Sequence, residues 1–186
     1  MTEYRGILFY ADASGGKVDK RSLLALEKLR DLASELGVYV DAVLAGTDTD
    51  AAAKELITYG AKKVFVAKDS NYDEYDTQRL FSLLTAMVQK MNPEAVAFAD
   101  SFTAKDIGPR LAQRLGSSFV AACTALSIEE RERKIVQTHM VFGGKVTFRH
   151  LTTVNAPQVF SVKVDTSMNP YEADYARGEV IEWPES

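Results

Sequence analysis

Short, unbroken apolar runs alternate with longer amphipathic segments over the first two thirds of the chain. An apolar run of this length is typical of a strand that is buried on both faces of a parallel sheet. In the segments between the runs, leucines and other apolar residues recur at helical spacing, which predicts helices with one buried face. The predicted strands are residues 6–10, 38–45, 63–67, 95–99 and 118–124, with a predicted helix between each consecutive pair.

Signals at the helix ends support this alternation. Asp19 is the expected N-cap of the first helix and Gly37 its expected C′ residue. The third helix is expected to stop at Asn92-Pro93, because the residue before a proline avoids the helical conformation. Parallel strands joined by right-handed helical crossovers form an α/β fold. We therefore predict a Rossmann-like, doubly wound parallel sheet with the strand order 3-2-1-4-5.

The pattern changes after Thr124, where strand-like segments follow one another without a helix between them. Gly143-Gly144 lies between the first two of these segments and is a hairpin signal. We expect antiparallel edge strands built from residues 135–164. The predicted domain covers residues 1–168, and residues 169–186 are expected to be a C-terminal tail or connector. The individual segments are residues 135–142, 146–153 and 159–164.

Composition narrows the class of protein. The chain has 186 residues and a formal net charge of −4, so it has no basic excess for binding nucleic acid. A single cysteine, Cys123, excludes an internal disulfide framework and fits a reducing compartment. No apolar run approaches the length of a membrane-spanning helix, and the N-terminus does not resemble a signal peptide. We expect a cytoplasmic protein without membrane insertion, or a mitochondrial matrix protein if a leader has been removed.

Ser14-Gly15-Gly16 follows the first predicted strand and resembles the SGGxD phosphate loop of ATP pyrophosphatases. In such a loop, backbone amides and a helix N-terminus hold phosphate groups. The match is incomplete, because Asp19 falls one residue late and Lys20 stands where a hydroxyl residue is expected. The alternative is a flexible turn that joins a strand to a helix. The sequence contains neither G-x-G-x-x-G nor a Walker lysine motif.

Thr103-Ala-Lys-Asp106 has the spacing of a capping box, which predicts a helix that begins at Thr103. Pro109 complicates this boundary, because a proline in the first turn would move the start of the regular helix nearer to Asp106. The functional alternative is an anion site formed by Thr103, Lys105 and free backbone amides.

No catalytic or metal site is predicted. His139 and His150 are the only histidines, and they stand in strand-like segments without a cysteine or carboxylate cluster at ligand spacing. No serine occupies a G-x-S-x-G elbow. Cys123 stands at the end of an apolar predicted strand, which favours a small buried residue over a nucleophile. The sequence therefore does not predict a self-sufficient enzyme.

The segment TAKDIGPRLAQRLG at residues 103–116, followed by FVAACTALSI and HMVFGGKV, resembles the N-terminal domain of the electron-transfer flavoprotein alpha subunit. In that family, T-G-R-D-L-A-P-R-x-A-x-x-L-G leads to a strand with an acidic residue and then to an aromatic residue with glycines. Phe142, Gly143 and Gly144 match the last part, and the order of elements agrees across residues 5–165. The departures are Ala104 and Lys105 for Gly-Arg, Ala122 for the acid, and His139-Met140 and Lys163-Val164 for Arg-Pro pairs.

The resemblance implies a divergent alpha-subunit scaffold that lacks the C-terminal FAD-binding domain. Such a scaffold pairs with a beta subunit in a heterodimer, while FAD in the complete assembly accepts electrons from dehydrogenases. We expect that this chain alone does not hold FAD and that in isolation it could form a homodimer. One alternative is a free-standing adenine-nucleotide-binding module of the ATP pyrophosphatase-like or alpha-hydrolase type. It would bind AMP or ATP through Ser14, Gly15, Gly16 and the turn at Thr103. A purely structural assembly subunit is a third interpretation.

Overall fold

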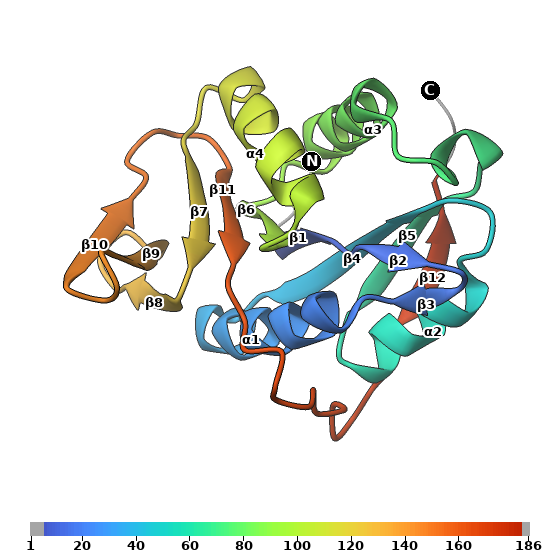
Figure 1. The fold of residues 1–186 in the computed structure, drawn as a ribbon, viewed down its shortest axis with the longest axis horizontal. Helices are drawn as coiled ribbons and strands as arrows, with labels where there is room; N and C mark the ends of the chain where they lie inside the picture. Colours follow the sequence, from blue (N-terminus) through green and yellow to red (C-terminus); the bar gives the residue numbers. More distant parts are fainter. Residues whose placement is uncertain (1–5, 184–186) are drawn as a thin grey trace.

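The computed structural model describes residues 6–183 (Figure 1). Residues 1–5 of the predicted domain and residues 184–186 of the predicted tail lie outside the described part. The helices are α1 (Lys20–Leu36), α2 (Asp50–Thr58), α3 (Thr77–Met91) and α4 (Phe102–Arg114), with a 3-10 turn η1 (Ser70–Tyr72). The strands are β1 (Gly6–Tyr10), β2 (Ala13–Ser14), β3 (Lys17–Val18), β4 (Tyr39–Ala45), β5 (Lys63–Ala67), β6 (Ala95–Ala99), β7 (Phe119–Cys123), β8 (Ala125–Glu129), β9 (Lys134–Val141), β10 (Val146–Leu151), β11 (Gln158–Val162) and β12 (Glu179–Glu182).

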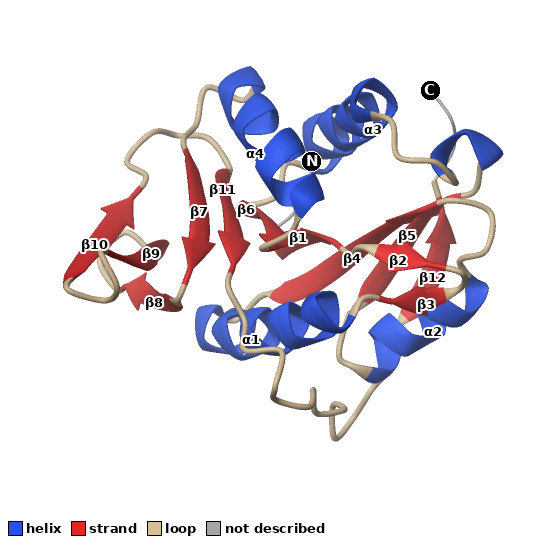
Figure 2. Ribbon diagram, in the orientation of Figure 1, coloured by secondary structure: helices blue, strands red, loops and turns tan. Residues whose placement is uncertain are grey.

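A seven-stranded parallel sheet forms the centre of the molecule, in the order β12-β5-β4-β1-β6-β11-β7. Helices α1 and α2 cover one face, and α3 and α4 cover the other (Figure 2). Strand β1 shows how the sequence builds both layers, because Ile7 and Phe9 pack on the α1–α2 side and Leu8 on the other side. The predicted Rossmann-like, doubly wound α/β class is confirmed. The five predicted strands keep their relative order 3-2-1-4-5, although β11 lies between the fourth and the fifth.

The prediction that residues 159–164 belong to the antiparallel extension is wrong. Strand β11 pairs in parallel with β6 on one side and β7 on the other. The physical reason is burial: all five residues of β11 are buried, so this strand belongs in the sheet centre. Sequence reasoning expected a helical crossover before a parallel strand, whereas the connection from β7 to β11 consists of β8, β9 and β10.

The antiparallel strands predicted at residues 135–142 and 146–153 are confirmed as β9 and β10, whereas β8 was not predicted. Strands β8, β9 and β10 form a three-stranded antiparallel sheet at one end of the molecule (Figure 1). In the β9–β10 hairpin Val141 pairs with Val146, and Gly143 and Gly144 stand in the turn with φ of 65° and 86°. These positive φ angles are readily adopted only by glycine, so this turn depends on the glycine pair.

The predicted tail contributes an edge strand. Strand β12 pairs in parallel with β5, and the Trp183 ring that follows it meets the Phe65 ring edge to face at 5.9 Å. The expected role of residues 169–186 as a connector stays a prediction. Within residues 6–183, no helix is both long enough and apolar enough to cross a membrane.

Candidate functional site

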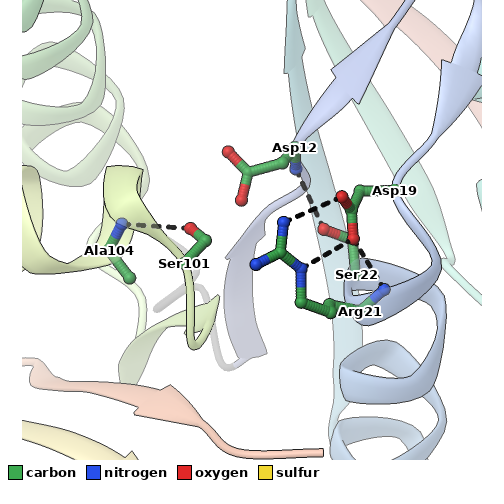
Figure 3. A network of polar contacts seen from close by, with 6 residues as sticks. All are labelled: Asp12, Asp19, Arg21, Ser22, Ser101 and Ala104. Atoms are coloured by element: carbon green, nitrogen blue, oxygen red, sulfur yellow. Dashed lines mark hydrogen bonds and ion pairs between the residues drawn. The ribbon is translucent and has the colours of Figure 1, made fainter. Parts of the chain in front are cut away.

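The direction of winding reverses between β1 and β6. The chain proceeds from β1 to β4 and β5 on one side and then returns through α3 to β6 on the other side. In open α/β sheets, ligands usually bind beyond the carboxyl ends of strands at such a switch point. Asp12 follows β1 there, and Asp100 and Ser101 follow β6. Figure 3 shows a network of polar contacts at this place, and we call its residues the switch-point cluster: Asp12, Asp19, Arg21, Ser22, Ser101 and Ala104, the last through its backbone N–H.

Helix α4 begins at Phe102, and its N-cap is Ser101, whose Oγ accepts a hydrogen bond from the Ala104 N–H at 3.3 Å. The predicted starts at Thr103 and near Asp106 are therefore wrong. Ser101 has the extended backbone that an N-cap needs, with φ of −131° and ψ of 177°. Pro109 does not mark the start but lies inside the helix.

Backbone hydrogen bonds fix Asp12 at the mouth of the switch point. Its N–H donates to Ser22 Oγ at 3.0 Å, and its carbonyl accepts from the Asp19 N–H at 2.8 Å. The carboxylate extends toward the start of α4 (Figure 3). Burial raises the pKa of Asp12, while the hydroxyls of Ser101 and Thr103 beside it act in the opposite direction. The chain thus places its own carboxylate at the N-terminal end of α4.

This placement matters because a helix N-terminus attracts anions. A phosphate at the start of α4 would meet the like charge of Asp12 in a partly buried environment, where such repulsion is strong. Thr103 is buried, and its hydroxyl faces Asp12. Lys105 is exposed, and its Nζ lies 3.6 Å from Asp100 Oδ1. Both predicted anion-binding side chains have a carboxylate of this chain as a neighbour, and their role in cofactor binding stays a prediction.

The second predicted loop is a small hairpin. Strands β2 and β3 pair antiparallel, with Ser14 opposite Lys17. Gly15 and Gly16 have φ of 56° and 74°, the conformation of a two-residue hairpin turn. A Cβ on Gly16 would lie 2.9 Å from Asp48 Oδ2, so the turn has an acid beside it. Nucleotide binding by Ser14, Gly15 and Gly16 remains a prediction, and this geometry does not favour it.

A carboxylate of this chain, that of Asp19, also occupies the N-terminal end of α1. The predicted N-cap Asp19 is confirmed, since its Oδ1 accepts from the Arg21 N–H at 2.7 Å, and the predicted Gly37 end is confirmed by its left-handed φ of 68°. The Arg21 guanidinium binds the same carboxylate with two nitrogens at 3.1 and 3.0 Å (Figure 3). These hydrogen bonds hold the pKa of Asp19 below its ordinary value. The Arg21 charge is therefore engaged by Asp19.

Asp106 and Phe102 on the outer side of α4 contact Tyr75 and Thr77. Asp106 Oδ2 accepts hydrogen bonds from the Tyr75 hydroxyl and from Thr77 Oγ1, each at 2.6 Å. Burial, followed by the hydrogen bond to Asp106, raises the pKa of Tyr75 to about 12. The Tyr75 ring meets the ring of Phe102 edge to face at 5.4 Å, and Phe102 is 71% exposed. These contacts fasten the loop before α3 to the start of α4.

Sequence reasoning missed Asp12, Asp100 and Ser101. The available signal was their position: each lies within two residues of the end of an unbroken apolar strand, and these two strands were predicted as neighbours. Within residues 6–183, no group of three or more His, Cys, Asp or Glu side chains is arranged to hold a metal ion.

A cavity of about 470 Å³ lies away from the switch-point cluster, beyond the amino ends of β6 and β11. Arg133 and Lys134 are among its lining residues. The Arg133 guanidinium donates to the Leu36 carbonyl at 2.6 Å, and Lys134 Nζ donates to the Thr152 carbonyl at 2.9 Å. Both cations already have partners within the chain, and the cavity gives no specific ligand chemistry.

The β9–β10 hairpin presents large apolar side chains to solvent. Phe142 is 76% exposed, Met140 55% and Phe148 46%. The register places Phe148 opposite His139, and their rings stack at 5.4 Å. Neighbouring apolar residues exposed in this way are typical of an interaction surface. The register places Val146 and Phe148 on one face of the hairpin and Met140 on the other, so we call Phe142, Val146 and Phe148 the hairpin surface.

Comparison with known proteins places the chain among electron-transfer proteins. Residues 7–186 match the family model described as electron transfer flavoprotein domain. The chain is 31% identical over 161 residues to electron transfer flavoprotein subunit alpha of Clostridium acetobutylicum, covering 87% of this chain and 48% of that protein. It is also 31% identical over 182 residues to the protein of the same name from Megasphaera elsdenii, covering 98% and 54%. Acryloyl-CoA reductase electron transfer subunit beta of Anaerotignum propionicum is 30% identical over 129 residues, 69% of this chain and 35% of that protein. The chain spans about half the length of the first two relatives.

Proposed function

Because this chain belongs to the electron transfer flavoprotein domain family, we propose that it is the scaffold domain of an alpha-subunit-related electron transfer flavoprotein. In this role it packs against a beta subunit and supports a FAD-carrying domain during electron transfer from dehydrogenases, in the cytoplasm. The flavin supplies the redox chemistry, and the protein positions it. The chain then acts as a component of an electron carrier and not as an enzyme in its own right.

The observation that carries the proposed role is the match of residues 7–186 to the electron transfer flavoprotein domain model. The position of the Asp12 carboxylate at the start of α4 supports the part of the proposal that concerns the flavin. A doubly wound fold that binds a dinucleotide places pyrophosphate at a helix N-terminus beyond the strand ends. Here Ser101 caps the helix, and Asp12 and Asp100 bring two acids to the same place. These residues do not fit the pyrophosphate of FAD. We infer that the domain contributes architecture, while the flavin is held elsewhere in the assembly.

The hairpin surface supports the proposed pairing with a beta subunit. This surface belongs to the β9–β10 hairpin of the small antiparallel sheet at one end of the molecule (Figure 1), and its apolar side chains are exposed. Aromatic residues such as Phe142 and Phe148 are enriched at the centres of protein interfaces. We place the beta-subunit contact on this surface. An isolated chain would use the same surface if it formed a homodimer.

The experiment that tests the scaffold role is a visible spectrum. The purified chain is mixed with excess FAD, passed through a desalting column and scanned in the flavin region. An intact electron transfer flavoprotein treated in the same way is the control and should keep its flavin. We expect no stoichiometric flavin band from this chain. A stoichiometric band would contradict the assignment of a scaffold without flavin.

The adenine-nucleotide alternative is not supported by the comparisons, which name electron-transfer proteins. The hairpin turn at Gly15-Gly16 and the acid beside it also weigh against a phosphate loop.

A further inference from the structure

The segment that follows β11 lies on the outside of the domain along its whole length. It leaves β11 within the sheet, passes the outer side of α1 and α2, and reaches the opposite edge as β12 (Figure 1). None of residues 163–183 is buried, whereas every residue of β11 is. We call residues 163–178 the strap. The strap and β12 are therefore joined to the domain almost entirely by surface contacts.

The strap is attached to the helices by hydrogen bonds of exposed groups. Such bonds contribute little, because water replaces the partner when the bond opens. These contacts include Lys20 Nζ with the Thr166 carbonyl at 2.9 Å, Lys28 Nζ with the Lys163 carbonyl at 3.2 Å, the Tyr171 N–H with Glu27 Oε2 at 3.0 Å, and the Ala173 N–H with the Thr58 carbonyl at 2.9 Å.

Strand β12 has one neighbour in the sheet, β5, and only Ile181 of its residues is partly buried. Its main anchor is Trp183, whose N–H donates to the Val66 carbonyl at 2.8 Å. The Trp183 ring packs against Phe65, and Lys90 Nζ lies 4.7 Å from its centre. Ile181 also packs against the core, and Lys63 Nζ of β5 lies 3.3 Å from Glu179 Oε1 at the exposed surface. Two partly buried apolar side chains and an exposed ion pair limit how firmly this edge strand is held.

Gly178 sets the approach of β12 to β5. A Cβ at this position would lie 2.7 Å from the Ala61 carbonyl oxygen and 2.9 Å from that of Lys62. Both obstacles are backbone atoms, so they cannot move aside as a flexible side chain would. The close approach of the chain at this point therefore requires glycine.

We propose that the strap and β12 form a releasable unit, in which β12 separates from β5 while the other six strands remain folded. Segments with few buried apolar contacts open at a lower free energy than the core to which they attach. Release exposes the outer edge of β5 and the ring of Phe65, and it frees the α1–α2 face from the strap. The seventh strand is then a conformational switch of the sheet edge. This inference does not rest on the proposed electron-transfer role.

Trp183 is the only tryptophan in the chain, so its fluorescence reports directly on β12. Urea unfolding is followed by Trp183 fluorescence and by far-ultraviolet circular dichroism on the same samples. We expect the fluorescence change at a lower urea concentration than the loss of helix and sheet. Hydrogen exchange should be at least tenfold faster in peptides covering residues 179–183 than in those covering residues 63–67. Coincident transitions with equal exchange protection would overturn the proposal.

The Gly178→Ala variant tests the proposal more directly, because its Cβ would push β12 away from β5. This variant should move the fluorescence transition to still lower urea and leave the circular dichroism transition in place. Asp174→Ala, at an exposed position of the strap, is the matched control and should change neither transition. If Gly178→Ala shifts both transitions together, or shifts neither, β12 is not a separately releasable unit.

Discussion

Gly108 of α4 lies directly against the ring of Phe119 in β7. A Cβ on Gly108 would come within 2.4 Å of Phe119 Cε2 and 2.7 Å of Cζ, distances that side chains do not reach without movement. Helix α4 therefore packs on the sheet at Gly108, a position where only glycine fits without movement of the Phe119 ring. Because α4 also presents the Ser101 cap and Thr103 to Asp12, this contact helps to set the geometry of the switch-point cluster.

Gly108→Ala should destabilise the protein by about 1–3 kcal/mol, because the Phe119 ring must be displaced from a packed core. The better helix propensity of alanine offsets about 1 kcal/mol of this loss. Urea unfolding measures the free energy. The smaller side chain of Phe119→Leu should recover part of the loss in the double variant. Gln113→Ala, at an exposed position of the same helix, should stay within about 0.5 kcal/mol of wild type. A Gly108→Ala protein as stable as wild type would show that the contact is not tight.

The Asp12→Asn variant should gain stability relative to the wild-type protein as pH rises. The pKa of Asp12 is raised in the folded protein by burial. The folded state therefore binds the proton more tightly, and wild type loses stability as pH rises from the unfolded pKa through the folded one. Asparagine has no such titration. The free energy of unfolding of both proteins is measured from pH 3 to pH 7, and a difference that is constant or opposite in sign would contradict a buried carboxylate.

The stability of the Asp19→Asn variant relative to wild type should depend on pH in the opposite direction. The hydrogen bonds from Arg21 hold the pKa of Asp19 below its ordinary value. The carboxylate therefore stabilises the folded protein above the unfolded pKa, and this stabilisation is lost as pH falls through the folded pKa. At neutral pH the variant should be about 0.5–1 kcal/mol less stable, since asparagine keeps the N-cap but loses the charge. The deficit should shrink in acid; a deficit that grows in acid would show that Asp19 is not stabilised as an anion.

Replacement of both Gly15 and Gly16 by alanine should affect stability and not ligand binding. Each alanine must adopt a positive φ, at a cost of about 1–2 kcal/mol. Thermal unfolding checks the first part, and calorimetric titration of the wild-type chain with ATP and AMP checks the second. We expect no micromolar binding to wild type. Micromolar ATP binding that disappears in the double variant with an unchanged melting curve would favour the nucleotide alternative.

The parts of the fold that could be predicted are those specified by local pattern. β1, β4, β5 and β6 appear as apolar runs because they are buried, and the Gly143-Gly144 hairpin has its own turn chemistry. β11 has an equally buried pattern, yet its place between β6 and β7 depends on long-range pairing that sequence spacing does not specify. The same holds for β12, whose partner β5 lies more than 100 residues earlier in the chain.

The candidate site was harder to predict because several neighbouring residues carry the same sequence signal. Asp100, Ser101 and Thr103 can each cap a helix, and only the backbone conformation shows that Ser101 does so. The Thr103–Asp106 spacing fits a capping box, but Asp106 instead accepts from Tyr75 and Thr77. The meeting of Asp12 with α4 follows from the neighbouring positions of β1 and β6, which arise from the three-dimensional winding of the sheet.

We propose that this domain pairs with an electron transfer flavoprotein beta subunit through the hairpin surface. The most direct test is size-exclusion chromatography with light scattering, applied to the chain mixed with a beta subunit from a bacterial relative. We predict a one-to-one complex that is lost in Phe142→Asp, because a charge at the centre of an apolar contact is costly. Tyr175→Asp, which changes an aromatic residue that is 92% exposed on the strap, should leave the complex intact. Separate elution of the two wild-type proteins, or a complex unaffected by Phe142→Asp, would contradict the account.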